Sequence, residues 1–244
     1  MDHKWIEDVK ASKDSLTNKL SNMSYKKIIL FIPHSSDKLD KSLWCGDIDS
    51  AVNKWTDWHT DKLFSSNDKR VESIVVPFSR FHCDAERLIN DPMESIGQGI
   101  AYLNIEGCTR ELSDAARQII FNEYHAIHQE LEDKAKPGSL IIDCHSFPSY
   151  LAPDIDICIG YNEDDSKPSE AVLDMVIDHF REAGFRVGVN DPYSNSMRVS
   201  ASIPTLMIEF NKAIYLQADG KTLCSDAYKK NFILKQLYNR LLKD

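Results

Sequence analysis

The residues best suited to chemistry in this sequence stand at the ends of apolar runs. His34 follows the run KIILFIP, and His145 closes the run SLIIDCH. Glu209 lies late in a third run, TLMIEFN, and Arg80 follows the run SIVVPFS. In open α/β sheets, ligands bind beyond the carboxyl ends of the strands, where loops present functional groups over a rigid platform. These four positions therefore predict one site at one edge of a sheet.

Two histidines and a carboxylate are the ligand types of a catalytic zinc site. Such a site takes three protein ligands and leaves a position for water. A single histidine is more often a structural or surface residue, because imidazole forms hydrogen bonds readily. The joint placement of His34 and His145 after apolar runs favours metal binding instead. Asp143 is expected on the same side of its strand as His145, where it either orients that ligand or pairs with a neighbouring cation.

A pair of acids lies in the segment WTDWHTDKLF, for which a helix over residues 55–64 is predicted. Asp57 and Asp61 are four residues apart and would share one face of that helix. Paired acids usually form a solvated face. Here Trp58 and Phe64 indicate that much of the helix is packed, and a carboxylate on a packed helix needs a cation or a metal as partner.

Several arginines are candidate ligands for a carboxylate group. The guanidinium groups of Arg80 and Arg87 can pair with a carboxylate through two hydrogen bonds, which lysine does poorly. Arg87 has an alternative partner in Asp84, three residues earlier. Arg198 lies in the turn-rich segment 190–198, from which it can close over a ligand. His125 lies on a predicted helix and faces either the cleft or solvent.

The order of the predicted elements indicates an α/β fold. Strands are predicted over residues 27–36, 73–80, 139–149, 155–160, 185–189 and 205–211. Helices are predicted over 5–22, 55–64, 111–134, 168–183 and 224–242, with Ile119 and Phe232 in the core and a long loop over 90–108. This alternation indicates a three-layer α/β sandwich, and the short connections favour a mixed central sheet.

Length and composition narrow the function classes. A chain of 244 residues without a Gly/Ser-rich or Pro-rich linker fits one domain over residues 1–244. The formal charge of -9 and the lack of a basic cluster argue against a nucleic-acid partner. The 6 cysteines form no CxxC pair and are expected to be reduced. No apolar run approaches ~20 residues and no secretion signal is recognised, so we expect a cytoplasmic protein without a membrane partner.

Seven short motifs occur in the order seen in the N-formylglutamate amidohydrolase family. They are Pro33-His34-Ser35, Thr56-Asp57-Trp58-His59, Ser79-Arg80 through Asp84-x-x-Arg87, Tyr124-His125, Asp143-x-His145-Ser146, Asn190-x-x-Tyr193 with Arg198, and Glu209 with Tyr215. The chain resembles this family over roughly residues 27–217. The resemblance implies a phosphorylase/hydrolase-like α/β sandwich, related to the zinc carboxypeptidases and aspartoacylases. It also implies hydrolysis of the small acidic molecule N-formyl-L-glutamate to formate and glutamate, a late step of histidine breakdown.

The resemblance further implies roles for individual residues. His34, Asp57 and His145 would bind one Zn²⁺ per chain, with Asp61 or Asp37 as alternatives to Asp57. The implied general base is Glu209, and the implied carbonyl-polarising cation is Arg87. The substrate-binding residues would be Arg80, Arg198, Asn190 and His125.

Two departures from the family pattern lie where substrate would bind. The chain has Asp84-Ala85-Glu86-Arg87 where the family often has Asp-x-Asn-Arg, and Asn195-Ser196 where the family tends to have paired glycines. Both departures affect the assignment of the substrate more than the assignment of the reaction. Two further hypotheses are therefore kept: a deacylase or metallopeptidase of the same fold with another substrate, and a non-catalytic binding protein. The absence of stoichiometric zinc would favour the binding protein.

Overall fold

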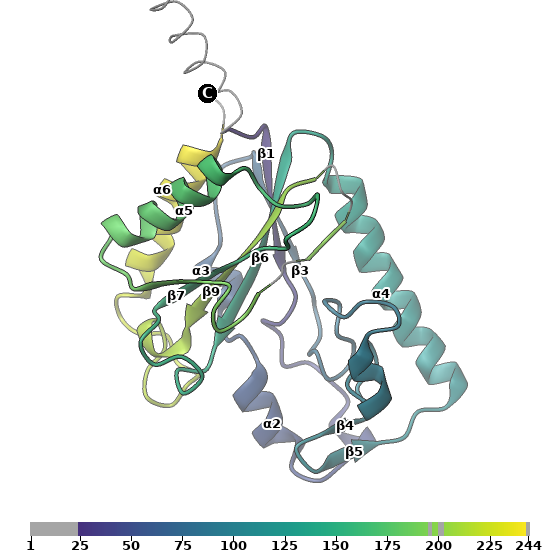
Figure 1. Ribbon diagram of the computed structural model, residues 1–244. Coiled ribbons are helices and arrows are strands. Elements are labelled where there is room, and N and C mark those ends of the chain that lie inside the picture. Colours follow the sequence, from purple (N-terminus) through teal and green to yellow (C-terminus); the bar gives the residue numbers. More distant parts are fainter. Residues whose placement is uncertain (1–23, 195–196, 200–202, 243–244) are drawn as a thin grey trace, which may run out of the picture.

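A mixed six-stranded sheet forms the middle layer of the protein, for which a computed structural model describes residues 24–194, 197–199 and 203–242. The strand order is β3 (Val71–Val75), β1 (Lys27–Ile32), β6 (Ser139–Phe147), β9 (Thr205–Asn211), β7 (Ile157–Gly160) and β8 (Val187–Val189). The first four of these run parallel, whereas β7 is antiparallel to β9. The mixed α/β architecture predicted from the sequence is confirmed (Figure 1).

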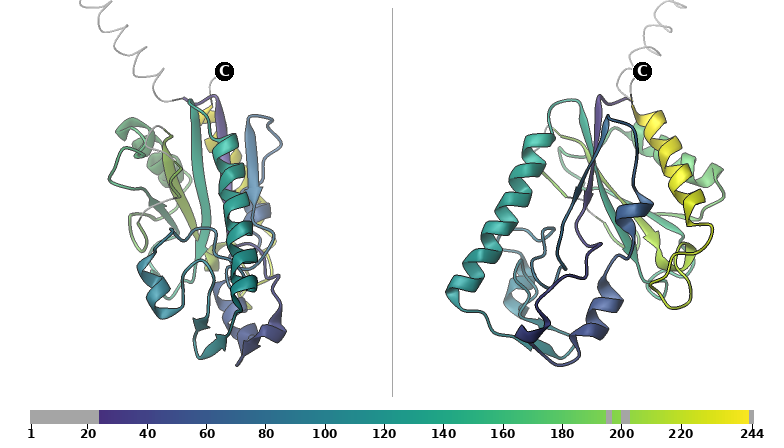
Figure 2. Two further views of the ribbon diagram at one scale, coloured as in Figure 1. Left: turned by 90° about the vertical axis from the view of Figure 1, so that its right-hand side faces the viewer. Right: turned by 180° about the vertical axis from the view of Figure 1, so that it is seen from behind.

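Helices cover both faces of this sheet (Figure 2). On one face, α4 (Asp114–Lys134) packs against alternate residues of β1, including Ile29 and Phe31. On the other face, α5 (Glu170–Glu182) and α6 (Ala227–Leu241) share a core with Ile28 and Leu30. Successive side chains of a strand point to opposite faces. The continuous apolar run of β1 therefore fills two cores, which gives three layers.

All nine residues of β6 are buried, and this strand carries polar side chains into the interior. Strands covered on both faces normally read as continuous apolar runs. The first four residues of β6 follow that pattern apart from Ser139, but Asp143, His145 and Ser146 near its carboxyl end do not. Buried polar groups require partners. The end of β6 is therefore the place where the fold must assemble a polar site.

A smaller layer lies beyond the carboxyl ends of the parallel strands, at the lower end of Figure 1. It consists of α2 (Ile48–Trp55) and a three-stranded sheet of β2 (Trp44–Cys45), β5 (Cys108–Arg110) and β4 (Asn104–Ile105). These elements have an apolar cluster of their own, which includes Trp44, Phe81 and Tyr102. The segment predicted as a long loop over 90–108 thus contains β4, the start of β5 and the 3₁₀ helix η2 (Pro92–Ile96).

The single helix predicted over residues 55–64 is wrong. Helix α2 ends at Trp55, and α3 (Thr60–Leu63) begins only after His59, whose φ of 62° lies in the left-handed region. Asp57 therefore lies in the connection between two helices and not on a helix face with Asp61. Strand β3 also ends earlier than predicted, at Val75, so that Arg80 lies in a turn.

Two predicted core residues are exposed because they lie outside the buried faces of their helices. Ile119 and Phe232 are 58% and 60% exposed, whereas Ile120 and Leu234 are buried. The helix predicted over residues 5–22 lies outside the described residues. Within residues 24–242 with the stated gaps, no helix has both the length and the apolar character of a membrane span.

Candidate active site

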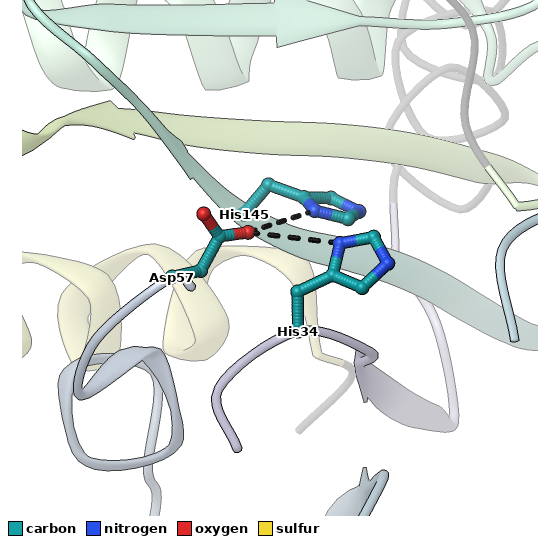
Figure 3. A group of neighbouring side chains, drawn as sticks. All are labelled: His34, Asp57 and His145. Carbon is teal, nitrogen blue, oxygen red and sulfur yellow. Dashed lines mark hydrogen bonds and ion pairs between the residues drawn. The ribbon is translucent and has the colours of Figure 1, made fainter. Parts of the chain in front are cut away.

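Three residues from different elements converge at the carboxyl ends of the parallel strands. His34 lies two residues after the end of β1, His145 lies in β6, and Asp57 lies between α2 and α3. Their side chains point toward one another (Figure 3), and one ligand atom from each lies within 4.8 Å of the others. Asp57 Oδ2 is 3.2 Å from His145 Nδ1 and 3.8 Å from His34 Nδ1. All three side chains are buried.

The second nitrogen of each imidazole faces another carboxylate. His34 Nε2 is 2.8 Å from Asp84 Oδ1, and His145 Nε2 is 2.9 Å from Asp143 Oδ1. A histidine that binds a metal through Nδ1 donates its Nε2–H to such a carboxylate, and these pairs orient histidine ligands and raise their basicity. Without a metal, His145 Nδ1 is hydrogen-bonded to Asp57 Oδ2. Asp143 thus has the orienting position that strand alternation predicts.

The donor set around the two Nδ1 atoms fits a divalent transition metal. Two imidazole nitrogens and one carboxylate oxygen are the protein ligands of a catalytic zinc site. Two other groups in the described part of the chain could hold a cation, and both include Glu86 and an imidazole that also faces Asp84 or Asp143. Each of those groups has one imidazole and two carboxylates, whereas His34, Asp57 and His145 supply two imidazoles and one carboxylate, so the Nδ1 group fits best. Asp61 and Asp37 belong to none of the three groups.

Asp57 is held from several sides. Its backbone N–H donates to His34 O at 2.9 Å, and its Oδ1 accepts a hydrogen bond from Ser146 Oγ at 3.0 Å. Burial acts to raise the pKa of Asp57, but the hydrogen bond with His145 and the positive charge of Lys212 outweigh burial and lower this pKa. Asp57 is therefore ionised at neutral pH, as a metal ligand must be.

Glu209 lies beside His145 on the neighbouring strand, since the two residues are register partners of β9 and β6. Glu209 is only 7% exposed, and its Oε2 has no hydrogen-bond partner among the described residues. Burial raises the pKa of Glu209 to about 8, against the opposing charge of His145. An elevated carboxyl pKa near neutrality suits a general base or acid.

Two arginines approach the site at different distances from the imidazoles. Arg80 Nη2 contacts the ring of His34, and Arg80 Nε is 4.0 Å from Asp84 Oδ2. Arg87 lies further out, where Nη2 donates to Tyr102 Oη at 2.9 Å and Nε is 3.6 Å from Asp84 Oδ2. Both Nε atoms are buried without a hydrogen-bond partner in the part of the chain that the structure describes. Arg80 is thus the cation closest to the metal-ligand group.

Asp57, His145, Glu209 and the two arginines line a cavity of about 740 Å³. The apolar cluster of the smaller layer contributes Phe81, Tyr102 and Ile105 to its wall, and Tyr193 and Met197 form another part of the wall. The backbone N–H of Met197 donates to Asp143 Oδ2 at 2.7 Å, which ties this wall to the metal-ligand group. The polar residues of the lining include Asp57, His145, Glu209, Glu86, Arg80, Arg87, Arg198 and Lys212.

Two residues assigned to substrate binding do not line this cavity. His125 lies exposed on α4, and Asn190 Oδ1 accepts a hydrogen bond from the backbone N–H of Tyr161 at 2.9 Å. Arg198 does line it, near the surface, and its Nη1 is 2.8 Å from Asp164 Oδ2. The departure at Asn195-Ser196 lies outside the described residues.

Sequence reasoning missed Lys212, gave Ser146 no role, and named Asp84 only as an alternative partner of Arg87. Lys212 lines the cavity, yet a lysine after the strand TLMIEFN carries no motif. Its position just beyond the end of β9 was an available signal, because the site gathers residues at strand ends. Ser146 directly follows His145, and Asp84 lies three residues before Arg87, but only the folded chain reveals their contacts with Asp57 and His34.

The layers and the strand-end site together define a hydrolase-like α/β sandwich. A family model described as N-formylglutamate amidohydrolase matches residues 26–216. The chain belongs to the N-formylglutamate amidohydrolase family, whose members hydrolyse an amide. The family resemblance seen in the seven motifs is therefore confirmed.

Two solved structures have the same fold. An N-formylglutamate amidohydrolase from Ralstonia eutropha JMP134 is 18% identical, with a TM-score of 0.74 over 89% of this chain and 93% of that chain. A gene product of Agrobacterium tumefaciens is 15% identical, with a TM-score of 0.64 over 90% of this chain and 89% of that chain. No curated protein matches the sequence significantly.

The raised pKa of Glu209 leads to a prediction about the metal-free protein. The folded-state pKa of about 8 lies above the ordinary value of 4.5. Ionisation of Glu209 therefore destabilises the folded protein relative to the unfolded chain. This loss of stability is negligible at pH values below the pKa of the unfolded chain, grows as the pH rises, and is complete above the pKa of the folded protein. We expect Glu209→Gln to stabilise chelator-treated protein little at pH 5 and by up to about 4 kcal/mol at pH 8.

Urea unfolding at the two pH values measures this difference. The exposed Glu132→Gln on α4 is the control, and it should change stability by less than about 0.5 kcal/mol at either pH. A Glu209→Gln protein whose gain in stability is the same at both pH values would contradict the raised pKa.

Proposed function

We propose that this protein is a zinc-dependent amidohydrolase that cleaves N-formyl-L-glutamate to formate and glutamate. The observation that carries this proposal is the buried His34–Asp57–His145 group with Glu209 beside it. The family supports amide hydrolysis, and the ligand types support zinc. A role in histidine breakdown and a cytoplasmic location stay predictions made from the sequence.

His34, Asp57 and His145 would hold the metal through two Nδ1 atoms and Oδ2. When bound, a divalent metal lowers the pKa of water toward ~7 and polarises the amide carbonyl. Asp84 and Asp143 keep the two imidazoles oriented for this task through Nε2. The chain itself supplies the remaining steps.

Glu209 is the proposed general base. Its ionised carboxylate takes a proton from the attacking water as the new carbon–oxygen bond forms. It then returns that proton to the amide nitrogen as the carbon–nitrogen bond breaks, which releases formate and the free amine. Its Oε2 has no hydrogen-bond partner among the described residues, so it can accept the proton and return it.

The contacts favour Arg80 as the cation that stabilises the developing oxyanion. Arg80 lies against His34, whereas Arg87 is anchored to Tyr102 and Asp84. A preorganised cation is most effective where negative charge develops. We therefore propose that Arg80 has the oxyanion role, and that Arg87 and Arg198 bind substrate carboxylates. This exchanges the roles of Arg80 and Arg87 relative to those implied by the sequence resemblance.

A second candidate is a deacylase of the same chemistry with a larger substrate. The cavity of about 740 Å³ falls in the range of roughly 300–1,000 Å³ that is typical for drug-sized ligands. N-formyl-L-glutamate is much smaller than such ligands. Phe81, Tyr102 and Ile105 would accommodate the apolar part of a larger acyl group or amino acid.

The first prediction concerns the metal. Protein purified without chelator should contain one zinc ion per chain and release formate from N-formyl-L-glutamate. Chelation should abolish the activity and added zinc should restore it. Metal analysis and a formate assay measure both quantities. Protein without zinc, whose activity is unchanged by added zinc, would exclude the metal mechanism and favour a binding protein.

The second prediction concerns Glu209. Glu209→Gln should lower kcat by about 10²–10⁴-fold, because the amide cannot accept the proton. The same variant should keep its zinc, since Glu209 belongs to none of the three cation-ligand groups in the described residues. Loss of zinc from Glu209→Gln would mean that this residue is a ligand and not the base.

The third prediction concerns Glu86, which lines the cavity within 3.8 Å of Arg80 Nη2. Its negative charge opposes binding of a substrate with two carboxylates. Glu86→Gln should therefore lower KM for N-formyl-L-glutamate by about fivefold, which corresponds to on the order of 1 kcal/mol. The KM for N-formyl-L-glutamine, which has one carboxylate fewer, should fall less. An equal change for both substrates would argue against an electrostatic role of Glu86 in specificity.

A further inference from the structure

Lys212 is a buried cation that no part of the proposed reaction uses. It begins the 3₁₀ helix η3 (Lys212–Ile214), directly after β9 and three residues after Glu209. The residue is only 8% exposed, although it lines the cavity. A buried lysine is costly unless its charge has partners. Its contacts therefore indicate what the position requires.

The ammonium group of Lys212 has three oxygen neighbours, and all belong to the segment that carries Asp57. Nζ donates to Lys54 O at 2.9 Å and to Thr56 O at 2.8 Å. It also lies 3.8 Å from Asp57 Oδ1. Lys212 thus connects the end of α2 to the end of β9 through hydrogen bonds.

The two oxygens of Asp57 have different surroundings. Oδ1 faces Lys212 Nζ and accepts a hydrogen bond from Ser146 Oγ. Oδ2 faces the two Nδ1 atoms. A carboxylate can rotate about its last bond unless its oxygens are distinguished by their partners. The partners of Oδ1 therefore fix the rotation that points Oδ2 at the metal-ligand group.

We propose that Lys212 is a positioning residue that, together with Ser146, orients Asp57 as a metal ligand. Lys212 acts from η3, directly after the strand that carries Glu209, and Ser146 acts from the strand that carries His145. One ammonium group thus fixes the connection between α2 and α3 relative to the base. This inference rests on the proposed metal-dependent function, because orientation of Asp57 matters only if Asp57 binds the metal.

The test is the zinc affinity of Lys212→Met, measured by competition with a chromophoric chelator. Loss of an orienting partner typically lowers metal affinity by about 10–100-fold, and we expect a loss in that range. The visible absorption of the Co²⁺-loaded protein should also change, because the ligand field depends on Asp57. Lys136→Met is the matched control: Lys136 Nζ also donates to a backbone carbonyl, that of Glu132, but at the surface. Its zinc affinity should equal that of the unmodified protein.

A double-mutant cycle separates positioning from a general structural role. In an Asp57→Asn background, Lys212→Met should lower zinc affinity by less than about twofold further, since the ligand it orients is already lost. A merely structural lysine would lower affinity again. Ser146→Ala, which removes the other partner of Oδ1, should lower zinc affinity in the same direction and serves if Lys212→Met fails to fold.

Each outcome decides the matter. Unchanged zinc affinity and an unchanged Co²⁺ spectrum in folded Lys212→Met would overturn the positioning role, and so would a full additional loss in the Asp57→Asn background. If Lys212→Met does not fold, unchanged affinity in Ser146→Ala overturns it. Failure of the proposed function is seen elsewhere, in unmodified protein that binds no zinc.

Discussion

Four carboxylates buried within one small region are the constraint on which the rest of the structure depends. Asp57, Asp84, Asp143 and Glu209 are each 7% exposed or less. An ionised carboxylate without partners in the interior would destabilise the fold by several kcal/mol. Arg80, Arg87 and Lys212 supply part of the compensating positive charge, and the two imidazoles supply hydrogen bonds. A divalent metal among the Nδ1 atoms would supply more, so the electrostatic requirement of the fold and the proposed chemistry agree.

The fold meets this constraint by using the ends of strands whose first halves are apolar. β1 and β6 are fixed by two hydrophobic cores, so the residues at their ends have little freedom. A ligand on such a strand needs few additional contacts, as His145 illustrates. A ligand on a connecting segment needs more, and Asp57 accordingly has backbone and side-chain partners on β6, on η3 and near the end of β1. The polar contacts of Asp57 thus fix the connection between α2 and α3 relative to the sheet.

The parts that could be predicted from sequence are those encoded locally. Apolar runs located the strands and brought His34, His145 and Glu209 to one edge, because parallel strand ends meet there. The position of Asp57 between two helices could not be predicted, since the turn at His59 overrides a helical pattern. The same holds for Arg80: its contact with His34 spans 46 residues and depends on a turn after β3. Ile119 and Phe232 were assigned to the core wrongly because both helices carry apolar residues outside their buried faces.

The charges of the cavity bear on how an anionic substrate enters it. All four cations of its lining already face a protein carboxylate: Arg80, Arg87, Arg198 and Lys212. These pairs differ in how easily they can be exchanged. Arg198 and Asp164 are 45% and 34% exposed in their side chains, and such a pair contributes only about 0–1 kcal/mol. Asp84 is buried, so separating Arg87 from it would remove one of the two arginines that compensate its charge. An incoming carboxylate therefore exchanges readily with Asp164 at Arg198, but at Arg87 it must add to the existing pair with Asp84.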